Sequence, residues 1–245
     1  MIIYGKNSVK EFLINSPSEI TEVFVFKGSK QSFYSEIEKL CKKNKLKLTS
    51  LSDSEISKLC KTTKHQGIAA NIKEFEYTDL GEFIQSLEVD ESDNLVVALD
   101  HIEDPHNLGA IIRSVNVLGA DAVIIARDRS CGVTPSVVKA SSGAVNYVPI
   151  IQEVNLSRTL EKLKNSGFWV AGADQGAEKN IYEEDFSGRS IALVMGSEGR
   201  GLGSNLKKQC DYLVKIPQAG QITSLNVSVA AGILIYELIY KTRCK

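Results

Sequence analysis

The chain has 245 residues, of which 43% are hydrophobic and 24% charged, and its formal net charge is −1. This composition is typical of a globular protein and disfavours a disordered chain. The apolar runs are short, as at 95–99 and 191–195, and none approaches the roughly 20 residues of a membrane span. No basic segment followed by an apolar one opens the chain. We therefore expect a cytoplasmic protein with no membrane contact.

The five cysteines indicate neither a disulfide framework nor a metal site. Their number is odd and none forms a C-x-x-C pair, and clustered His and Asp ligands are also lacking. We expect ordinary thiols and no bound metal.

Charge is distributed unevenly along the chain. Residues 1–75 contain 13 Lys and 8 acidic residues, a net charge of +5, whereas the remaining residues sum to −6. A basic first part is typical of a protein that contacts phosphates. A solvated lysine-rich face is the alternative, and charge alone leaves both interpretations open.

Hydrophobic periodicity predicts a small α/β domain over residues 1–75. We expect helices over 8–14 and 33–44, and strands over 22–26, 45–48 and 67–72. The acidic stretch 76–93 follows, and we interpret it as a linker with one weak helix.

A second domain is expected over residues 94–245, where short apolar runs alternate with amphipathic helical patterns. The predicted strands are 95–99, 121–126, 147–151, 168–173, 191–195 and 213–216, and the predicted helices are 107–119, 137–140, 156–166 and 224–240. This alternation predicts a parallel sheet covered on both faces. Ligands bind such sheets at the carboxyl ends of the strands.

Three polar or glycine-rich segments follow predicted strands. The segment 100–113 places Asn107 as the cap of a helix that contains Arg113. The segment 195–203 has glycines that allow a tight turn around a charged Glu198, but it is neither a P-loop nor a dinucleotide fingerprint. The segment 216–232 places Ser224 at the start of the last helix. Taken singly, each segment also fits an ordinary turn or capped helix.

Together the three segments resemble the signature motifs of the SpoU-type RNA methyltransferases of the SPOUT superfamily. The matching stretches are Asp104-Pro105-x-Asn107-x-Gly109-Ala110-x-x-Arg113, Met195-Gly196-Ser197-Glu198-Gly199-x-Gly201-Leu202, and Ile216-Pro217 with Ser224-Leu225-Asn226-Val227-Ser228-Val229-Ala230. In addition, residues 4–9 and 65–70 are similar to the ends of the ribosomal-protein-like substrate domain in the branch that methylates guanosine of large-subunit ribosomal RNA.

The resemblance implies a fold and a cofactor. The fold is a small ribosomal-protein-like domain followed by a parallel-sheet domain with a C-terminal trefoil knot, which sequence pattern cannot show. The cofactor is S-adenosylmethionine, held through Gly196, Ile216 and Leu225. Homodimerisation is implied as well, and Gln218 departs from the Met of many relatives.

The resemblance also implies the site residues, which are Asn107, Arg113, Glu198, Ser224 and Asn226. It assigns the proton step to Arg113. A guanidinium stays protonated, so a bidentate contact to the adjacent phosphate is the more physical role. Asn107 would orient Arg113 or the ribose, Glu198 would accept hydrogen bonds, and Ser224 and Asn226 would complete the polar wall.

The expected function is methylation of a ribose 2′-hydroxyl in RNA, with a guanosine of large-subunit ribosomal RNA as the expected target. Two alternatives stay open. The first is another RNA methyltransferase, which acts on a transfer-RNA 2′-hydroxyl or, as a resistance-type enzyme, on a different ribosomal nucleotide. The second is a ribosome-assembly protein that binds RNA without catalysis. Loss of the site residues would favour the second alternative, but all of them are present.

Overall fold

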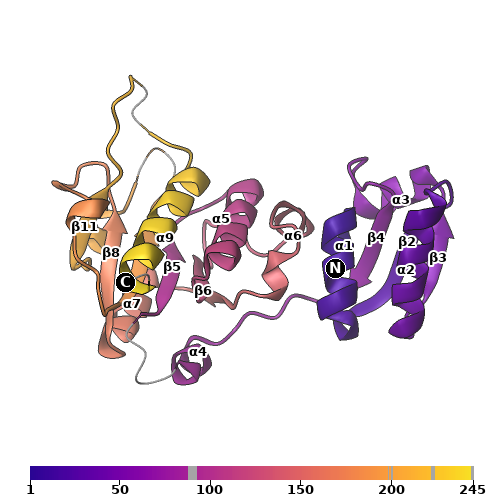
Figure 1. Cartoon of the computed structure of the whole chain (residues 1–245), viewed down its shortest axis with the longest axis horizontal. Helices are drawn as coiled ribbons and strands as arrows, with labels where there is room; N and C mark the ends of the chain where they lie inside the picture. Colours follow the sequence, from indigo (N-terminus) through magenta and orange to yellow (C-terminus); the bar gives the residue numbers. More distant parts are fainter. Residues whose placement is uncertain (88–92, 198, 200, 222–223, 244–245) are drawn as a thin grey trace. The chain divides into compact units, whose positions relative to one another are not determined.

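The computed structural model describes residues 1–87, 93–197, 199, 201–221 and 224–243. The chain divides into two compact units (Figure 1). The first consists of Met1–Glu76 and Val133–Asn146, and the second consists of Tyr77–Gly132 and Tyr147–Lys245. A segment from the middle of the chain therefore belongs to the first unit.

The first unit is built on a four-stranded sheet of order β1-β4-β2-β3. Its strands are β1 (Ile2–Tyr4), β2 (Ile20–Phe26), β3 (Leu48–Leu51) and β4 (Ile68–Ile72), and its helices are α1 (Lys6–Asn15), α2 (Gln31–Lys43), α3 (Asp53–Cys60) and α6 (Pro135–Ala140). β4 pairs antiparallel with β1 and β2, and β2 pairs parallel with β3. The pairing of β1 with β4 brings together the two segments that resemble a substrate domain.

One prediction in this unit was wrong, and two elements, β1 and α3, were not predicted. The strand expected at 45–48 begins only at Leu48, because Lys45 has a left-handed backbone with φ of 56°. Helix α3 was not predicted, although its sequence carries a capping box. Ser52 accepts a hydrogen bond from the Glu55 backbone at 3.4 Å, and the Glu55 carboxylate accepts one from the Ser52 backbone at 2.7 Å.

Helix α6 packs on α1 and β1 within the first unit. The Ser8 hydroxyl donates a hydrogen bond to the Val138 carbonyl at 3.2 Å, and the Lys139 ammonium lies 4.9 Å from the centroid of the Tyr4 ring. Burial lowers the pKa of Lys139 first, and the nearby Lys64 charge lowers it further. Residues 133–146 follow β6 and precede β7 in the sequence, and these contacts place them in the first unit.

The second unit contains a seven-stranded sheet of order β7-β6-β5-β10-β8-β11-β9, in which every described strand pair is parallel. Its strands are β5 (Leu95–Leu99), β6 (Ala122–Ala126), β7 (Ile150–Glu153), β8 (Phe168–Ala173), β9 (Lys179–Asn180), β10 (Ser190–Met195) and β11 (Tyr212–Lys215). Its helices are α4 (Leu80–Ser86), α5 (Pro105–Leu118), α7 (Leu156–Asn165), α8 (Ser204–Lys207) and α9 (Val227–Arg243). Strands β5, β6 and β10 are buried along their whole length, as the apolar runs predict for a sheet covered on both faces.

Both helix starts predicted at the motifs were wrong by a few residues. Asp104 caps α5 by accepting a hydrogen bond from the His106 backbone at 2.9 Å, so Asn107 lies inside the first turn and is not the cap. Proline at the first position of α5 favours this earlier start. Asn226, and not Ser224, caps α9, because its side-chain oxygen accepts from the Ser228 backbone at 2.9 Å.

The C-terminal helix returns across the sheet. β11 is separated from β5 by β8 and β10, yet α9 packs on α5, the helix that follows β5 (Figure 1). The knotted threading that the resemblance implies stays a prediction. Among the described residues, no helix is long and apolar enough to cross a membrane.

We predict that Ser52→Ala lowers the free energy of unfolding by about 1 kcal/mol, because it removes the side-chain acceptor of the capping box. Chemical denaturation of the purified protein measures the change, with Ser32→Ala on the exposed face of α2 as the matched control. Equal stability of the two variants would contradict the role of the box.

Candidate functional site

The first two motif segments meet because β5 and β10 are neighbouring parallel strands. Leu99 is in register with Met195, and the Asp100 backbone N–H donates to the Met195 carbonyl at 2.8 Å. Asp100 and Gly196 therefore leave the sheet side by side. The third segment begins where β11 ends, at the same edge of the sheet.

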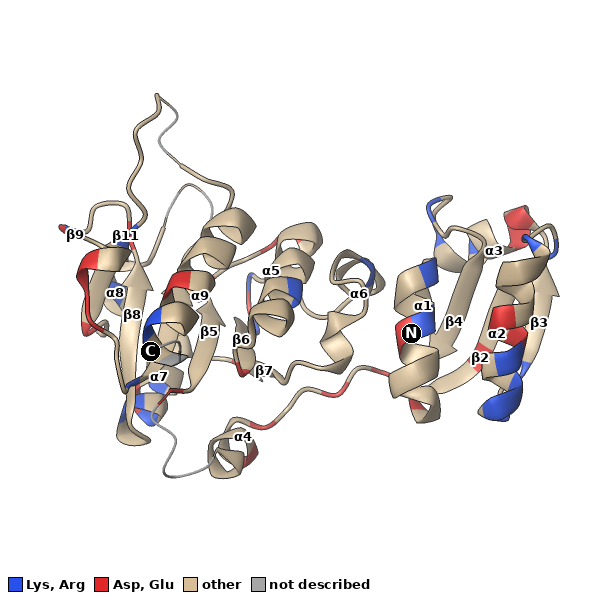
Figure 2. Ribbon diagram, in the orientation of Figure 1, with Lys and Arg blue, Asp and Glu red and all other residues tan. Residues whose placement is uncertain are grey.

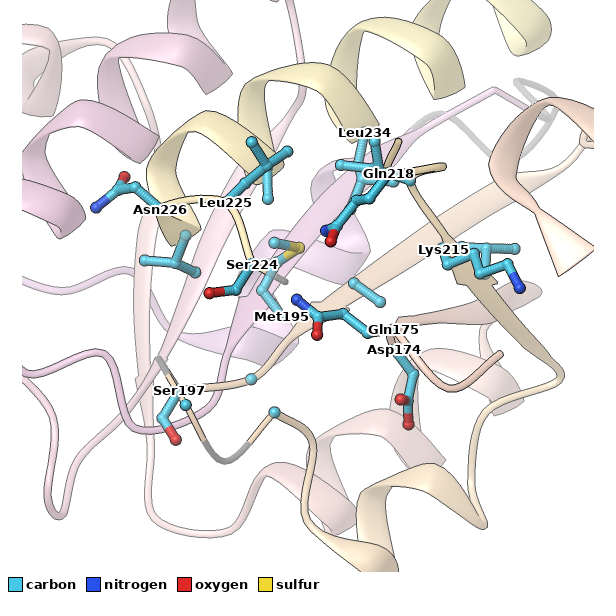
Figure 3. Close-up of a pocket in the computed structure, with 18 of the residues that line it drawn as sticks. Asp174, Gln175, Met195, Ser197, Lys215, Gln218, Ser224, Leu225, Asn226 and Leu234 are labelled. Atoms are coloured by element: carbon cyan, nitrogen blue, oxygen red, sulfur yellow. The ribbon is translucent and has the colours of Figure 1, made fainter. Parts of the chain in front are cut away.

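A cavity of about 590 Å³ lies at this edge (Figure 3). Its lining includes every described residue that the sequence selected from the second and third segments, namely Gly196, Ile216, Ser224, Leu225 and Asn226. Sequence reasoning missed other lining residues, including Asp174, Gln175, Lys207 and Leu234. The volume is typical of a site for a small molecule or cofactor.

The cavity combines an apolar part with polar groups. Met195 and Leu234 are buried, whereas Ser224 and Asn226 are exposed on the rim. Figure 3 shows Gln175 and Gln218 approaching the same space from two different segments. Gln218 therefore lines the space in which a ligand would bind.

Gly196 is needed for the tight loop at the cavity wall. A Cβ atom at this position would lie 2.2 Å from the carbonyl carbon and 2.3 Å from the oxygen of Gly201. The loop closes through a hydrogen bond from the Gly201 backbone N–H to the Ser197 carbonyl at 3.0 Å. Glu198, which the sequence placed in the site, lies outside the described residues.

An ion pair between Asp174 and Lys207 borders the cavity. Burial raises the pKa of Asp174, but the hydrogen bonds from Lys207 and from the Gly176 backbone outweigh it, so that the pKa is lowered overall. Asp174 directly follows β8, and its position at the carboxyl end of a strand was the sequence signal that could have identified it as a site residue.

A second cavity of about 570 Å³ adjoins the first, and the two share Ser197, Gly201 and Val227 in their linings. The other lining residues are Asp100, His101, Ile102, Glu103, Asp104, Asn107, Arg129 and Gly203. Apart from Asn107, sequence reasoning assigned none of these a role. The residues from Asp100 to Asn107 come directly after β5, at a strand's carboxyl end, which was the available signal, whereas Arg129 and Gly203 come from other loops.

The structure brings Asn107 and Asn226 together. The Asn226 amide donates a hydrogen bond to the Asn107 side-chain oxygen at 2.9 Å, which links the first turn of α5 to the cap of α9. Arg113 lies at an exposed position of α5, and neither cavity includes it in its described lining. The predicted contact between Asn107 and Arg113 stays a prediction.

The part of the chain that the structure describes holds no group of three or more His, Cys, Asp or Glu side chains placed to bind a metal ion.

We predict that the Asn107–Asn226 hydrogen bond couples the two helices by about 1 kcal/mol. The double-mutant cycle uses Asn107→Ala and Asn226→Ser, because serine keeps a capping oxygen but is too short to reach Asn107. Denaturant unfolding of the two single variants and the double variant measures the coupling. Additive effects would show that the bond adds no stability.

Two family profiles cover most of the chain. The "SpoU rRNA Methylase family" matches residues 94–236, and the "RNA 2'-O ribose methyltransferase substrate binding" family matches residues 2–78. The first match contains both cavities.

Individual proteins agree with these matches. The chain is 38% identical over 243 residues to a "Putative TrmH family tRNA/rRNA methyltransferase" of Staphylococcus haemolyticus, covering 99% of this chain and 96% of that protein. It is 36% identical over 241 residues to the "Putative TrmH family tRNA/rRNA methyltransferase YacO" of Bacillus subtilis. That match covers 98% of this chain and 95% of the relative.

Among solved structures, the SpoU methyltransferase AviRb of Streptomyces viridochromogenes in complex with AdoMet has the same fold. Its TM-score is 0.80 at 21% identity, and the match covers 98% of this chain and 89% of that one. The chain belongs to the SpoU/TrmH family of RNA methyltransferases.

Proposed function

We propose that this protein transfers a methyl group from S-adenosylmethionine to the 2′-hydroxyl of a ribose in RNA. The observation that carries the proposal is the pair of adjoining cavities at the carboxyl ends of β5 and β10. One cavity suits the methyl donor, and the other suits the nucleotide that receives the methyl group.

The first cavity fits the cofactor on its own features. The missing side chain at Gly196 lets the loop close against the Gly201 backbone, and this close approach shapes the wall of the cavity. Apolar Met195 and Leu234 offer a surface for an adenine ring, and we propose that the backbone of Gly196, Ile216 and Leu225 binds its edge. When bound, S-adenosylmethionine supplies a methyl group on a sulfonium that leaves readily.

Alignment is the main task left to the protein. Holding the ribose oxygen in line with the methyl carbon saves several kcal/mol of entropic cost. Asn107 and Asn226, joined to each other, stand where both cavities meet, and we propose that they orient the ribose. We propose that Ser224 adds a polar group to the cavity wall, and that Glu198 accepts hydrogen bonds, as the motif implies.

The first unit supports an RNA substrate with a large contact surface. Lysines are spread over α1 and the end of α2 (Figure 2), and residues 1–75 carry a net charge of +5. Phosphate contacts by such a surface position RNA without reading its sequence. We propose a guanosine of large-subunit ribosomal RNA as the target. Transfer RNA is the second candidate, because the relatives are described as tRNA/rRNA methyltransferases.

A homodimer is proposed on the exposed face of α9. Val229, Ile233, Tyr236 and Tyr240 are each at least 41% exposed and follow one helical stripe. An apolar stripe of this kind is typical of an interface between helices.

We propose that the protein acts in the cytoplasm.

The experiment that tests the function uses total RNA from a strain that lacks the gene. The RNA is incubated with the protein and radiolabelled S-adenosylmethionine, and the labelled nucleotide is mapped. The proposal expects label on one ribose 2′-oxygen in ribosomal RNA. Label confined to transfer RNA would select the second candidate, and label on a base would contradict the proposal.

We predict that Gly196→Ala weakens S-adenosylmethionine binding at least 10-fold, because the added methyl displaces the Gly201 backbone from the cavity wall. Calorimetric titration of the folded variant measures the affinity. Gly203→Ala is the matched control, since a Cβ atom there meets nothing within 4 Å. Unchanged binding by Gly196→Ala would place the cofactor elsewhere.

We predict that Arg113→Ala lowers methyl transfer at least 100-fold and leaves S-adenosylmethionine binding within twofold of wild type, because the guanidinium binds RNA phosphate and not the cofactor. Arg158→Ala, on the exposed start of α7, is the control. Near-normal turnover by Arg113→Ala would remove this residue from the mechanism.

A further inference from the structure

The second cavity contains an imidazole–carboxylate pair. His101 follows β5 by two residues, and its Nδ1 atom contacts the Asp100 carboxylate. A carboxylate only accepts hydrogen bonds, so this contact places the imidazole proton on Nδ1. The other ring nitrogen, Nε2, then carries a lone pair that can accept a proton.

The pair is positioned by the sheet. The Asp100 side chain is only 11% exposed, and its backbone N–H is bonded to the carbonyl of Met195, next to Gly196 in the cofactor cavity. His101 is 33% exposed and faces the second cavity. The pair therefore lines the second cavity, next to the strand end that borders the first, with the carboxylate largely buried and the imidazole partly exposed.

The backbone of His101 is unusual. Its φ of 58° lies in the left-handed region, which side-chain-bearing residues seldom adopt. Glycine adopts this conformation without strain. His101 therefore lines the cavity at a cost to its own backbone conformation.

The remaining charged groups of this cavity are less suited to accept a proton. Asp104 caps α5 through its carboxylate, Glu103 lies on the exposed rim, and Arg129 is cationic. Arg129 can instead bind a phosphate of the RNA. Arg113 belongs to neither described lining, and a guanidinium only donates hydrogen bonds.

We propose that His101, oriented by Asp100, accepts the proton of the ribose 2′-hydroxyl during methyl transfer. The proposal rests on the proposed function. As the 2′-oxygen forms its bond to the methyl carbon, the carbon–sulfur bond breaks and its electron pair goes to sulfur. The hydroxyl proton passes to Nε2 of His101, and the Asp100 carboxylate stabilises the resulting imidazolium.

The test measures single-turnover methyl transfer to total RNA from the deletion strain, using the full-length protein. His101→Gly removes the imidazole and relieves the left-handed backbone, so the variant is expected to fold. His106→Ala is the control, because His106 is an exposed histidine at the start of α5 that lines neither described cavity. Calorimetry measures S-adenosylmethionine affinity in parallel, and added imidazole tests for rescue.

We expect His101→Gly to lose about 100-fold or more of the single-turnover rate, the range for a general base. S-adenosylmethionine affinity should stay within about twofold, and imidazole should restore activity more strongly as the pH rises, since only neutral imidazole accepts a proton. Asp100→Asn should give a smaller loss, and His106→Ala should match wild type.

Two results would overturn the proposal while leaving the proposed function intact. One is a rate for His101→Gly within about threefold of wild type. The other is a loss that imidazole does not restore and that comes with weaker cofactor binding, which would assign His101 a structural role. If the wild-type protein methylates no RNA, the proposed function fails, and this proposal fails with it.

Discussion

The parallel pairing of β5 with β10 is the constraint on which the site depends. Because Leu99 and Met195 are in register, the chain leaves both strands at the same edge, and two segments almost one hundred residues apart become neighbours. The Gly196 loop forms a wall of one cavity, and the residues that follow β5 line the other. Both strands are fully buried, so this arrangement is fixed by the core of the sheet.

A second link keeps the two cavities together. Helix α9 returns from the far side of the sheet to α5, and the Asn226–Asn107 hydrogen bond joins their starts. One asparagine therefore caps a helix and contacts another helix at the junction. A transfer reaction needs two bound groups at a fixed separation, and the sheet edge and the helix pair together provide such a frame.

The sequence predicted most strands and the motifs of the second unit, because apolar runs and strand ends are local signals. The two-residue strand β9 was not predicted, and β7 begins at Ile150 and not at 147. Helix caps were harder, since Asn107 and Ser224 are both good capping residues, and only the geometry showed Asp104 and Asn226 in that role. The strand expected at 45–48 was displaced by the left-handed Lys45, which alternation alone does not reveal.

The second cavity could not be predicted from sequence, because it forms only where separate segments come together. His101 and Arg129 belong to different loops, and each looks like an ordinary surface residue on its own. Arg113 illustrates the reverse case, because a motif residue selected by resemblance lies outside both described linings. We propose that Arg113 contacts RNA, and the fold of the protein alone does not show which residues contact RNA.

A crystal structure of the protein with S-adenosylhomocysteine tests the central claim most directly. The account predicts that the adenine lies between Met195 and Leu234 with its edge on the backbone of Ile216 and Leu225, and that the sulfur points toward the junction near Asn107. A nucleoside bound away from the Gly196 loop, or a sulfur that faces away from the second cavity, would contradict it.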